Sequence, residues 1–286
     1  MKQSIFKLRI LVALCLLLFY ASCSSDQDIE PDFLAARELL NESYGNDPKQ
    51  KMDVYLPAGR TQSETPVLIY IHGGAWIDGD KSEFLQFKPL LEKEFPGYAF
   101  ISLNYRLFDF STGKNSILDQ EKDIIAAFNS IENQLADWNI SDDIIISGAS
   151  AGGHLALLHA LKNNTSDLKA AIAFFPPTDL TELYKFNNLT ALGLSAVLGG
   201  TPTTAALNYQ STSPINYVDS KDVPTIFFHG NLDTVVPISQ SELLKNALQI
   251  AGVRHQFTVV PGQGHGFPPA INEQLIKQAK EFIGEF

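Results

Sequence analysis

The stretch from Ile144 to Leu158 constrains the fold of this 286-residue chain more than any other. A β-branched apolar run leads into a Gly-x-Ser-x-Gly turn centred on Ser150, and an Ala/Leu-rich helical segment follows. Such a sharp turn strains the serine backbone and has room only for small neighbours, and the residues next to Ser150 are glycine or alanine. The pattern is typical of a nucleophile elbow, which holds a serine hydroxyl where a histidine can reach it. The alternative is an ordinary strand–turn–helix junction with an unreactive serine.

The order of strand and helix patterns predicts an α/β fold. Continuous apolar runs, of the kind that a parallel sheet buries on both faces, alternate with helical patterns along the chain. This alternation predicts a mostly parallel central sheet with helices on both faces. The expected strands are 52–56, 67–71, 99–103, 144–146, 170–175, 225–228 and 256–260, the first of them at the edge of the sheet. The expected helices are 32–40, 81–94, 115–136, 151–162, 239–251 and 271–286.

One large domain is expected from residue 51 to residue 286, since this length suits a single α/β core and the chain shows no internal repeat. Within it, residues 176–222 are poorly periodic and rich in Asn, Thr, Pro and Gly, which predicts a small cap insertion. Residues 23–50 are interpreted as a lipidated tether and lead-in segment.

Residues 1–22 are predicted to be a signal peptide. Three basic residues precede the apolar run Ile10–Ala21, whose twelve residues fall short of the roughly 20 that a membrane-spanning helix needs. Such a segment is removed from the mature protein and takes no part in the fold.

The small residues before Cys23 resemble a bacterial lipobox, although Tyr20 stands where leucine is usual. This resemblance implies that Cys23 carries a lipid, so we expect an exported protein whose only membrane contact is a lipid anchor in the bacterial outer membrane. Acidic residues after Cys23 resemble surface-export signals and extend this expectation to the cell surface. Secretion or a periplasmic location is the alternative.

The charge of the chain argues against one class of partner, and its motifs argue against bound cofactors and metals. The formal charge is −11, and without residues 1–22 there are 18 basic residues against 32 acidic ones, or −14. This balance argues against nucleic acid as a partner. We expect no cofactor and no metal, because the sequence has no metal-ligand cluster, phosphate loop or dinucleotide fingerprint.

Three reactive residues follow predicted strands at the same edge of the sheet. The carboxyl ends of parallel strands gather the site in such folds, and the loops there carry Ser150, Asp233 and His265 in that order. His265 would take the proton of the serine hydroxyl, and Asp233 would orient the imidazole. The rival acid is Asp179, one strand earlier, which the sequence favours as a helix cap.

A second glycine-rich loop follows the strand 67–71 and reads His72-Gly73-Gly74-Ala75-Trp76. Glycines let backbone N–H groups approach a developing oxyanion, so the predicted oxyanion donors are Gly73, Gly74 and Ala151. Trp76 is a candidate for the wall of the substrate pocket, with a place in the core as the alternative.

These motifs together resemble carboxylesterases of the hormone-sensitive-lipase-like branch of the α/β hydrolases. The resemblance covers residues 50–286 and implies an α/β-hydrolase fold and hydrolysis of esters through an acyl-Ser150 intermediate. The longer N-terminal cap helices of that branch are not expected here, which implies an open site acting on short-chain acyl or carbohydrate acyl esters. The motifs that carry the resemblance are KMDVYLP at 51–57, HGGAW at 72–76, GASAGG at 148–153, HGNLDTVVP at 229–237 and GHG at 264–266.

Two other functions remain open. The loops of Ser150, Asp233 and His265 also resemble prolyl-oligopeptidase-like enzymes, and the loop at 72–74 is shared with arylformamidases, so a serine peptidase or amidase is the alternative enzyme. A non-enzymatic binding module on a hydrolase scaffold is the third reading.

Overall fold

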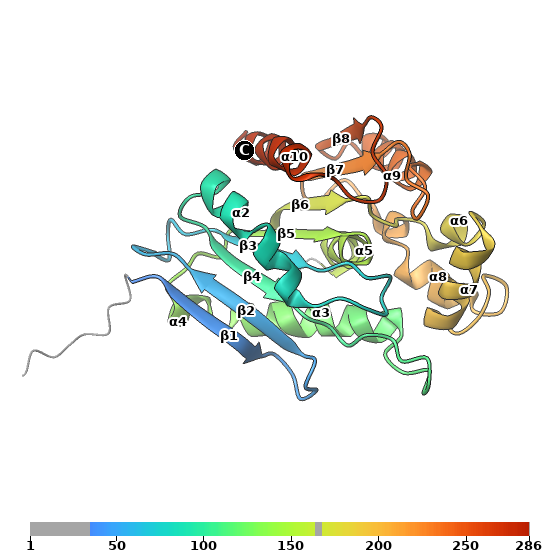
Figure 1. Ribbon diagram of the computed structural model, residues 1–286, viewed down its shortest axis with the longest axis horizontal. Helices are drawn as coiled ribbons and strands as arrows, with labels where there is room; N and C mark the ends of the chain where they lie inside the picture. The colour runs from blue at the N-terminus through green and yellow to red at the C-terminus, as the bar shows by residue number, and fades with distance from the viewer. Residues whose placement is uncertain (1–34, 164–167, 286) are drawn as a thin grey trace, which may run out of the picture. The chain divides into compact units, whose positions relative to one another are not determined.

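The computed structural model describes residues 35–163 and 168–285 (Figure 1). The predicted signal peptide and Cys23 lie outside the described residues. Within those two ranges, no helix combines the length and the apolar character needed to cross a membrane.

An eight-stranded sheet forms the centre of the described domain, with the strand order β1-β2-β4-β3-β5-β6-β7-β8. The pairs β1–β2 and β2–β4 are antiparallel, and all pairs from β4 to β8 are parallel. The predicted mostly parallel α/β sheet is therefore confirmed. The strands are β1 (Arg37–Ser43), β2 (Lys51–Leu56), β3 (Val67–Ile71), β4 (Ala99–Leu103), β5 (Ile144–Ala149), β6 (Leu168–Phe174), β7 (Thr225–Gly230) and β8 (His255–Val260).

Two predictions about the first part of the domain are wrong. Residues 37–40 belong to strand β1 and not to a helix, and β2 is not an edge strand, because β1 pairs along its outer side. The apolar spacing near Leu39 and Leu40 imitates a helix, but Asn41 has a φ of 62° at an irregularity in the β1–β2 pairing. The charged, exposed side chains of β1 suit a sheet edge, where they discourage pairing with another chain.

Helices cover both faces of the sheet, as the sequence predicts. A hydrophobic core on one face includes side chains of α3, α5 and α9, and a second core on the other face includes those of α2 and α10 (Figure 1). The described helices are η1 (Lys81–Gln86), α2 (Lys88–Glu94), α3 (Ile117–Glu132), α4 (Leu135–Trp138), α5 (Ala151–Leu158), the π-helical η2 (His159–Asn163), α6 (Leu180–Tyr184), α7 (Asn188–Val197), α8 (Ala206–Thr212), η3 (Pro214–Tyr217), α9 (Ser239–Ala251) and α10 (Pro269–Ile283).

The segment predicted as a cap insertion lies between β6 and β7. It folds into α6, α7, α8 and η3. Leu194, Val197 and Tyr209 bury their side chains in the core that α3 and α5 share. Leu189 and Leu192 of α7 remain exposed.

Candidate active site

Ser150 occupies a strained turn between β5 and α5, with φ 54° and ψ −122°. Its N–H donates to the carbonyl of Phe174 on β6 at 2.9 Å, and its own carbonyl accepts the N–H of His154 at 2.9 Å. Both bonds fix a conformation that L residues rarely adopt. At Gly152 an added Cβ would overlap the carbonyl oxygens of Ile71 and His72, so only glycine lets α5 approach the end of β3.

The side chains of Ser150, His265 and Asp233 form one continuous hydrogen-bonded chain. His265 Nε2 lies 2.8 Å from Ser150 Oγ, and His265 Nδ1 lies 2.7 Å from Asp233 Oδ2. For both contacts to be hydrogen bonds, the imidazole carries its proton on Nδ1 and accepts the serine hydroxyl at Nε2. The histidine side chain is 19% exposed, while that of Asp233 is fully buried. The three residues that the sequence singles out are thus brought together from three loops.

The Asp233 carboxylate is held in its ionised form. Oδ1 accepts the N–H groups of Val235 and Val236 at 2.9 and 3.0 Å. Burial by itself would raise the pKa of this carboxyl, but hydrogen bonds from His229 and His265 and from the backbone outweigh it and hold the pKa below its usual range. A charged acid therefore faces His265 at neutral pH.

His229 is a supporting residue whose role sequence reasoning missed. It is buried at the end of β7, with Nδ1 2.7 Å from Ser241 Oγ. Its Nε2 lies 2.9 Å from the Val236 carbonyl and 3.4 Å from Asp233 Oδ2. The available signal was the four-residue spacing between His229 and Asp233 across a tight turn. The imidazole of His229 thus holds the loop that carries Asp233 in place.

The rival acid, Asp179, lies at the N-terminus of α6. Its Oδ1 accepts the N–H groups of Thr181 and Glu182 at 2.9 and 3.0 Å, which is the geometry of a helix N-cap. The carboxylate that bonds to His265 is that of Asp233.

The glycine-rich loop after β3 lies against the elbow. A Cβ added at Gly73 would lie 3.1 Å from the Ala149 carbonyl oxygen and 3.5 Å from Ser150 Cβ. Gly74, which follows Gly73, has a φ of 104° and turns the chain sharply. Ala151 is the first residue of α5 and follows the serine directly. The predicted oxyanion donors Gly73 and Ala151 therefore both adjoin Ser150.

Trp76 packs in the core rather than on an open pocket wall. It is buried, and its Nε1–H donates to His154 Nδ1 at 3.2 Å. The other ring nitrogen of His154 lies 2.7 Å from the carbonyl oxygen of Thr212 on α8. Burial lowers the pKa of His154 to about 4, only partly offset by the bond to Thr212. A neutral His154 thus links the glycine-rich loop, α5 and the segment between β6 and β7.

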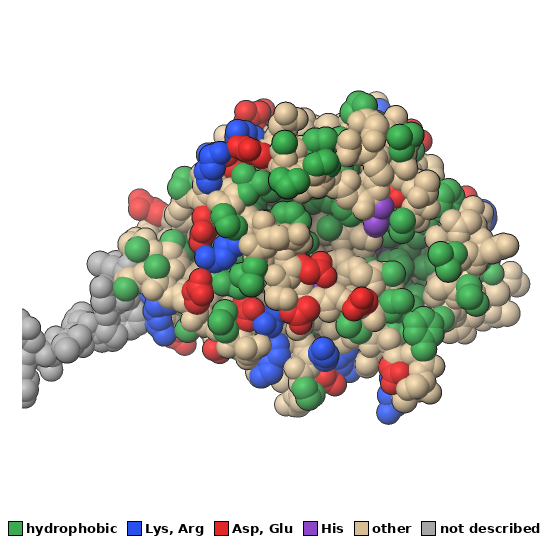
Figure 2. All heavy atoms as spheres, in the orientation of Figure 1, with side chains coloured by type: hydrophobic (Ala, Val, Ile, Leu, Met, Phe, Trp, Pro, Cys, Tyr) green, Lys and Arg blue, Asp and Glu red, His purple; other side chains and the backbone are tan. Residues whose placement is uncertain are grey.

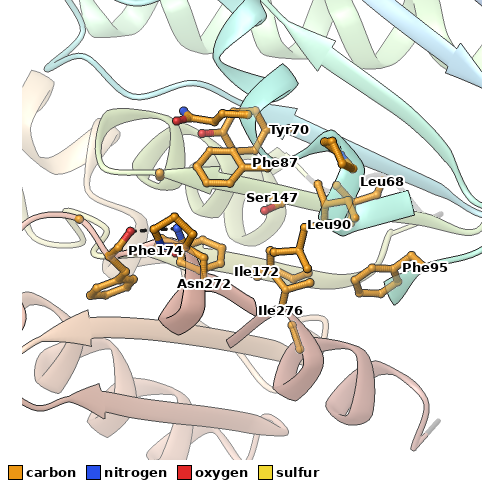
Figure 3. Close-up of a pocket in the computed structure, with 18 of the residues that line it drawn as sticks. Leu68, Tyr70, Phe87, Leu90, Phe95, Ser147, Ile172, Phe174, Asn272 and Ile276 are labelled. Atoms are coloured by element: carbon orange, nitrogen blue, oxygen red, sulfur yellow. Dashed lines mark hydrogen bonds between the residues drawn. The ribbon is translucent and has the colours of Figure 1, made fainter. Parts of the chain in front are cut away.

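An apolar pocket of about 520 Å³ lies between α2 and α10, on the face of the sheet opposite α5 (Figure 3). It reaches Ala149, next to Ser150, and Gly266, next to His265. Phe175 also lines it, with a φ of 39° and its ring centroid 4.5 Å from that of His265. Figure 2 shows a hollow with hydrophobic side chains inside it and a histidine at its rim. The sequence held no signal for this pocket, because its walls are far apart in the chain.

The part of the chain that the structure describes contains no group of three or more His, Cys, Asp or Glu side chains arranged to hold a metal ion.

Proteins that are similar to this chain in sequence include esterases. Esterase LipC of Mycobacterium tuberculosis is 26% identical over 239 residues, which cover 78% of this chain and 58% of the relative. The chain spans only 55–58% of the length of the first curated relatives that it matches.

Two solved structures are similar over most of the chain. A truncated carbohydrate esterase from gut microbiota has a TM-score of 0.74 at 25% identity, covering 89% of this chain and 97% of that one. A bifunctional GH43-CE protein of Bacteroides eggerthii has a TM-score of 0.74 at 28% identity, covering 89% of this chain and 38% of that one. These likenesses confirm the α/β-hydrolase fold that the motifs imply.

The family itself is given by a match to a family model over residues 52–248, a range that contains the glycine-rich loop, Ser150 and Asp233. The chain belongs to the BD-FAE family.

Proposed function

We propose that this protein is a carboxylic ester hydrolase in which Ser150 is the nucleophile. The observation that carries the proposal is the unbroken hydrogen-bonded chain from Ser150 Oγ through His265 to Asp233. The esterase names of its relatives, among them Esterase LipC and the truncated carbohydrate esterase, support the same reaction class.

The reaction would proceed in two steps. His265 Nε2 takes the proton from Ser150 Oγ as the oxygen attacks the ester carbonyl, and the same proton passes to the alcohol that leaves. Water then attacks the acyl-Ser150 ester, giving its proton to His265, and the acid leaves as the serine recovers its proton. Asp233 keeps the imidazole in the correct tautomer and stabilises its charged form.

Three backbone amides would stabilise the tetrahedral intermediate. We assign this role to the N–H groups of Gly73, Gly74 and Ala151. Gly73 and Ala151 both adjoin Ser150, and Gly74 directly follows Gly73. Loss of one such donor typically removes about 3 kcal/mol of transition-state stabilisation.

The proposed substrates are short-chain acyl or carbohydrate acyl esters. Support comes from the two similar structures, one named as a carbohydrate esterase and the other as a bifunctional GH43-CE protein. The same catalytic groups could also cleave amides, so an anilide belongs in any assay.

The test compares the wild type with Ser150→Ala and with the exposed control Ser63→Ala. We expect the wild type and the control to hydrolyse p-nitrophenyl acetate and to be labelled by a fluorophosphonate. Ser150→Ala should lose at least about 10⁴-fold in kcat and all labelling. Activity that survives in Ser150→Ala would contradict the proposal, and faster cleavage of a p-nitroanilide than of the ester would favour an amidase.

We further propose that residues 1–22 direct export and that Cys23 carries the lipid anchor in the outer membrane. The basis is the sequence pattern alone. Radiolabelled palmitate should label the wild type and not Cys23→Ser, and equal labelling of both would refute the assignment.

A further inference from the structure

The glycine-rich loop after β3 contains three successive residues with positive φ. The angles are 104° at Gly74, 51° at Ala75 and 65° at Trp76. Glycine adopts such angles freely, but alanine and tryptophan carry a Cβ that makes them unfavourable. Two neighbouring side-chain-bearing residues stay in this conformation only where their surroundings hold them, and strain of this kind gathers at functional sites. The loop is therefore a strained segment that other parts of the domain must hold in place.

This strained segment follows directly on the first proposed oxyanion donor. A Cβ added at Gly73 would lie 3.5 Å from Ser150 Cβ, so the backbone at this position passes close to the nucleophile. The carbonyl oxygen of Gly74 accepts the N–H groups of Ile77 and Asp78, both at 3.0 Å, which closes the loop into a tight turn. Because the turn is so short, a contact that fixes its middle also fixes the direction of the donor N–H groups at its start.

Trp76, in the middle of this turn, is held by three hydrogen bonds from outside it. Its carbonyl oxygen accepts the N–H of Phe108 at 2.9 Å and Nε2–H of Gln120 on α3 at 2.8 Å. Its indole N–H donates to His154 on α5 at 3.2 Å. Three segments that are far apart in the chain thus restrain one strained residue.

Gln120 is completely buried, and the orientation of its amide is fixed by its surroundings. Its Nε2 donates to the carbonyl of Asn115 at 3.1 Å as well as to that of Trp76. A rotated amide would place its own oxygen against these two carbonyl oxygens, so the nitrogen must face them. As a result Oε1 points the other way, where it is buried and has no hydrogen-bond partner among the residues that the structure describes.

Packing alone does not explain a glutamine at this position. Its neighbours on the same face of α3 are the buried residues Ile117, Ile124 and Ile131. A methionine would fill the same space without leaving a polar atom unpaired, and an unpaired buried amide oxygen is unfavourable. The glutamine is better explained by the hydrogen bond that it donates to the strained residue Trp76.

We propose that Gln120 is a positioning residue of the oxyanion hole. By holding the Trp76 carbonyl, it keeps the loop in the conformation that directs the N–H groups of Gly73 and Gly74 toward the developing oxyanion. The donors are then in place before the reaction begins, and no reorganisation is needed during it. The proposal rests on the proposed esterase function and adds to it a completely buried residue that does not touch the substrate.

The effect of losing this bond should fall on the transition state rather than on binding of the substrate. The full negative charge on oxygen exists only near the tetrahedral intermediate, so displaced donors weaken that state most. We expect Gln120→Met to lower kcat/KM for p-nitrophenyl acetate by about tenfold, with most of the loss in kcat. This is less than the roughly 100- to 1,000-fold loss on removing a whole donor, because the N–H groups are displaced and not deleted.

The decisive measurement is the inhibition constant of trifluoroacetone. Ser150 Oγ adds to the ketone carbon, His265 takes the serine proton, and the carbonyl electron pair moves to the oxygen, so the adduct carries an oxyanion and no group leaves. Such a mimic of the tetrahedral intermediate measures the oxyanion hole directly. Its inhibition constant does not depend on how much of the protein is folded. In Gln120→Met it should rise about tenfold, by the same factor as kcat/KM falls.

Ile131→Val is the matched control. Ile131 is completely buried and lies eleven residues after Gln120, about three turns along the same face of α3. The variant removes one methylene group from the core and so lowers stability without reaching the loop at Trp76. With active sites counted by fluorophosphonate labelling, its kcat and its inhibition constant should equal those of the wild type.

Two variants keep the proposal open to refutation. If Gln120→Met folds and binds trifluoroacetone as tightly as the wild type, Gln120 does not position the donors. If Gln120→Met does not fold, Gln120→Asn decides, because it keeps a buried amide but is shorter by one methylene group and cannot reach the Trp76 carbonyl. The inhibition constant of Gln120→Asn should rise in the same way, and an unchanged value would overturn the proposal.

The positioning role and the function beneath it can fail separately. If the wild type neither cleaves esters nor reacts with a fluorophosphonate, the esterase function itself is wrong. If the wild type cleaves esters and the Gln120 variants keep its kcat and its inhibition constant, the esterase function stands and the role of Gln120 does not.

Discussion

At the scale of the residue, the proposed chemistry depends on one buried carboxylate. Asp233 receives two backbone N–H bonds on one oxygen and His265 on the other. This arrangement lets the acid hold a single tautomer of the imidazole without taking its proton, since hydrogen bonds keep the pKa of the carboxyl below its usual range.

Replacing Asp233 by asparagine should remove most of the activity while leaving the fold of the domain intact. Asp233→Asn keeps the size of the side chain but favours the wrong imidazole tautomer, so we expect kcat to fall by about 10⁴-fold. The matched control is Asp179→Asn, because asparagine caps helices about as well as aspartate does. The measurement is ester hydrolysis at saturating substrate. An equal loss in both variants would mean that Asp233 has no special role.

At the scale of the element, the elbow depends on how closely α5 approaches β3. Gly152 faces the carbonyl oxygens of Ile71 and His72, and no side chain fits between them. Gly193, in the middle of α7, has no atom within 4 Å of the position that a Cβ would take.

The two helical glycines should therefore respond in opposite directions to alanine. Gly152→Ala should destabilise the fold by about 1–3 kcal/mol, because overlap with backbone outweighs the better helix propensity of alanine. Gly193→Ala should stabilise it by about 0.5–1 kcal/mol. Urea unfolding gives both values. A stabilised Gly152→Ala would mean that the contact between α5 and β3 is looser than the structure describes.

His154 connects three elements and should make stability depend on pH. Burial lowers the pKa of His154 to about 4 in the folded state, against an ordinary value of about 6.5 in the unfolded chain. Folding thus favours the neutral ring, and this contribution is complete above pH 6.5 and is lost as the pH falls toward 4. The lost stability amounts to roughly 3 kcal/mol, since one pKa unit corresponds to about 1.4 kcal/mol.

The variant that isolates this effect is His154→Gln, which can still bond to Trp76 and Thr212 but does not titrate. Between pH 7 and pH 4 its unfolding free energy should fall by up to roughly 3 kcal/mol less than that of the wild type. His255→Gln, a half-buried histidine at the start of β8, should follow the wild type. Parallel pH profiles for the wild type and His154→Gln would contradict the role of this ring.

At the scale of the whole domain, parallel strands bring distant residues to one edge. The loops after β3, β5, β7 and β8 carry the glycine-rich turn, Ser150, Asp233 and His265. Because β3 to β8 run parallel, these loops share the carboxyl edge of the sheet. Local sequence was enough to predict this, since each strand and each reactive residue has its own pattern.

Features that depend on a distant partner could not be predicted. The residues of β1 lack the alternation of apolar and polar side chains that marks a strand, and they form one by pairing with β2. The pocket needs Leu90 and Ile276, which are separated by 185 intervening residues, to lie on its two sides. The sequence places His229 at the end of a strand but does not show that the turn after this strand brings Asp233 next to its imidazole. In each case the feature depends on how distant elements pack together, and the periodicity of the local sequence carries no information about that packing.

The edge strand offers a test of how the domain protects its sheet. Met52 and Val54 of β2 are completely buried, and β1 pairs along β2 at five register positions. A chain shortened to begin at residue 44 lacks β1, while one that begins at residue 35 keeps every described strand. At about 0.2–1 kcal/mol per cross-strand pair, loss of β1 should lower the unfolding free energy by roughly 1–5 kcal/mol.

Loss of β1 should also cause association that increases with concentration, because the exposed backbone of β2 can pair with another chain. Urea unfolding and light scattering measure the two effects. If both shortened chains were equally stable and monomeric, β1 would contribute nothing to the sheet, and the charges along it would need another explanation.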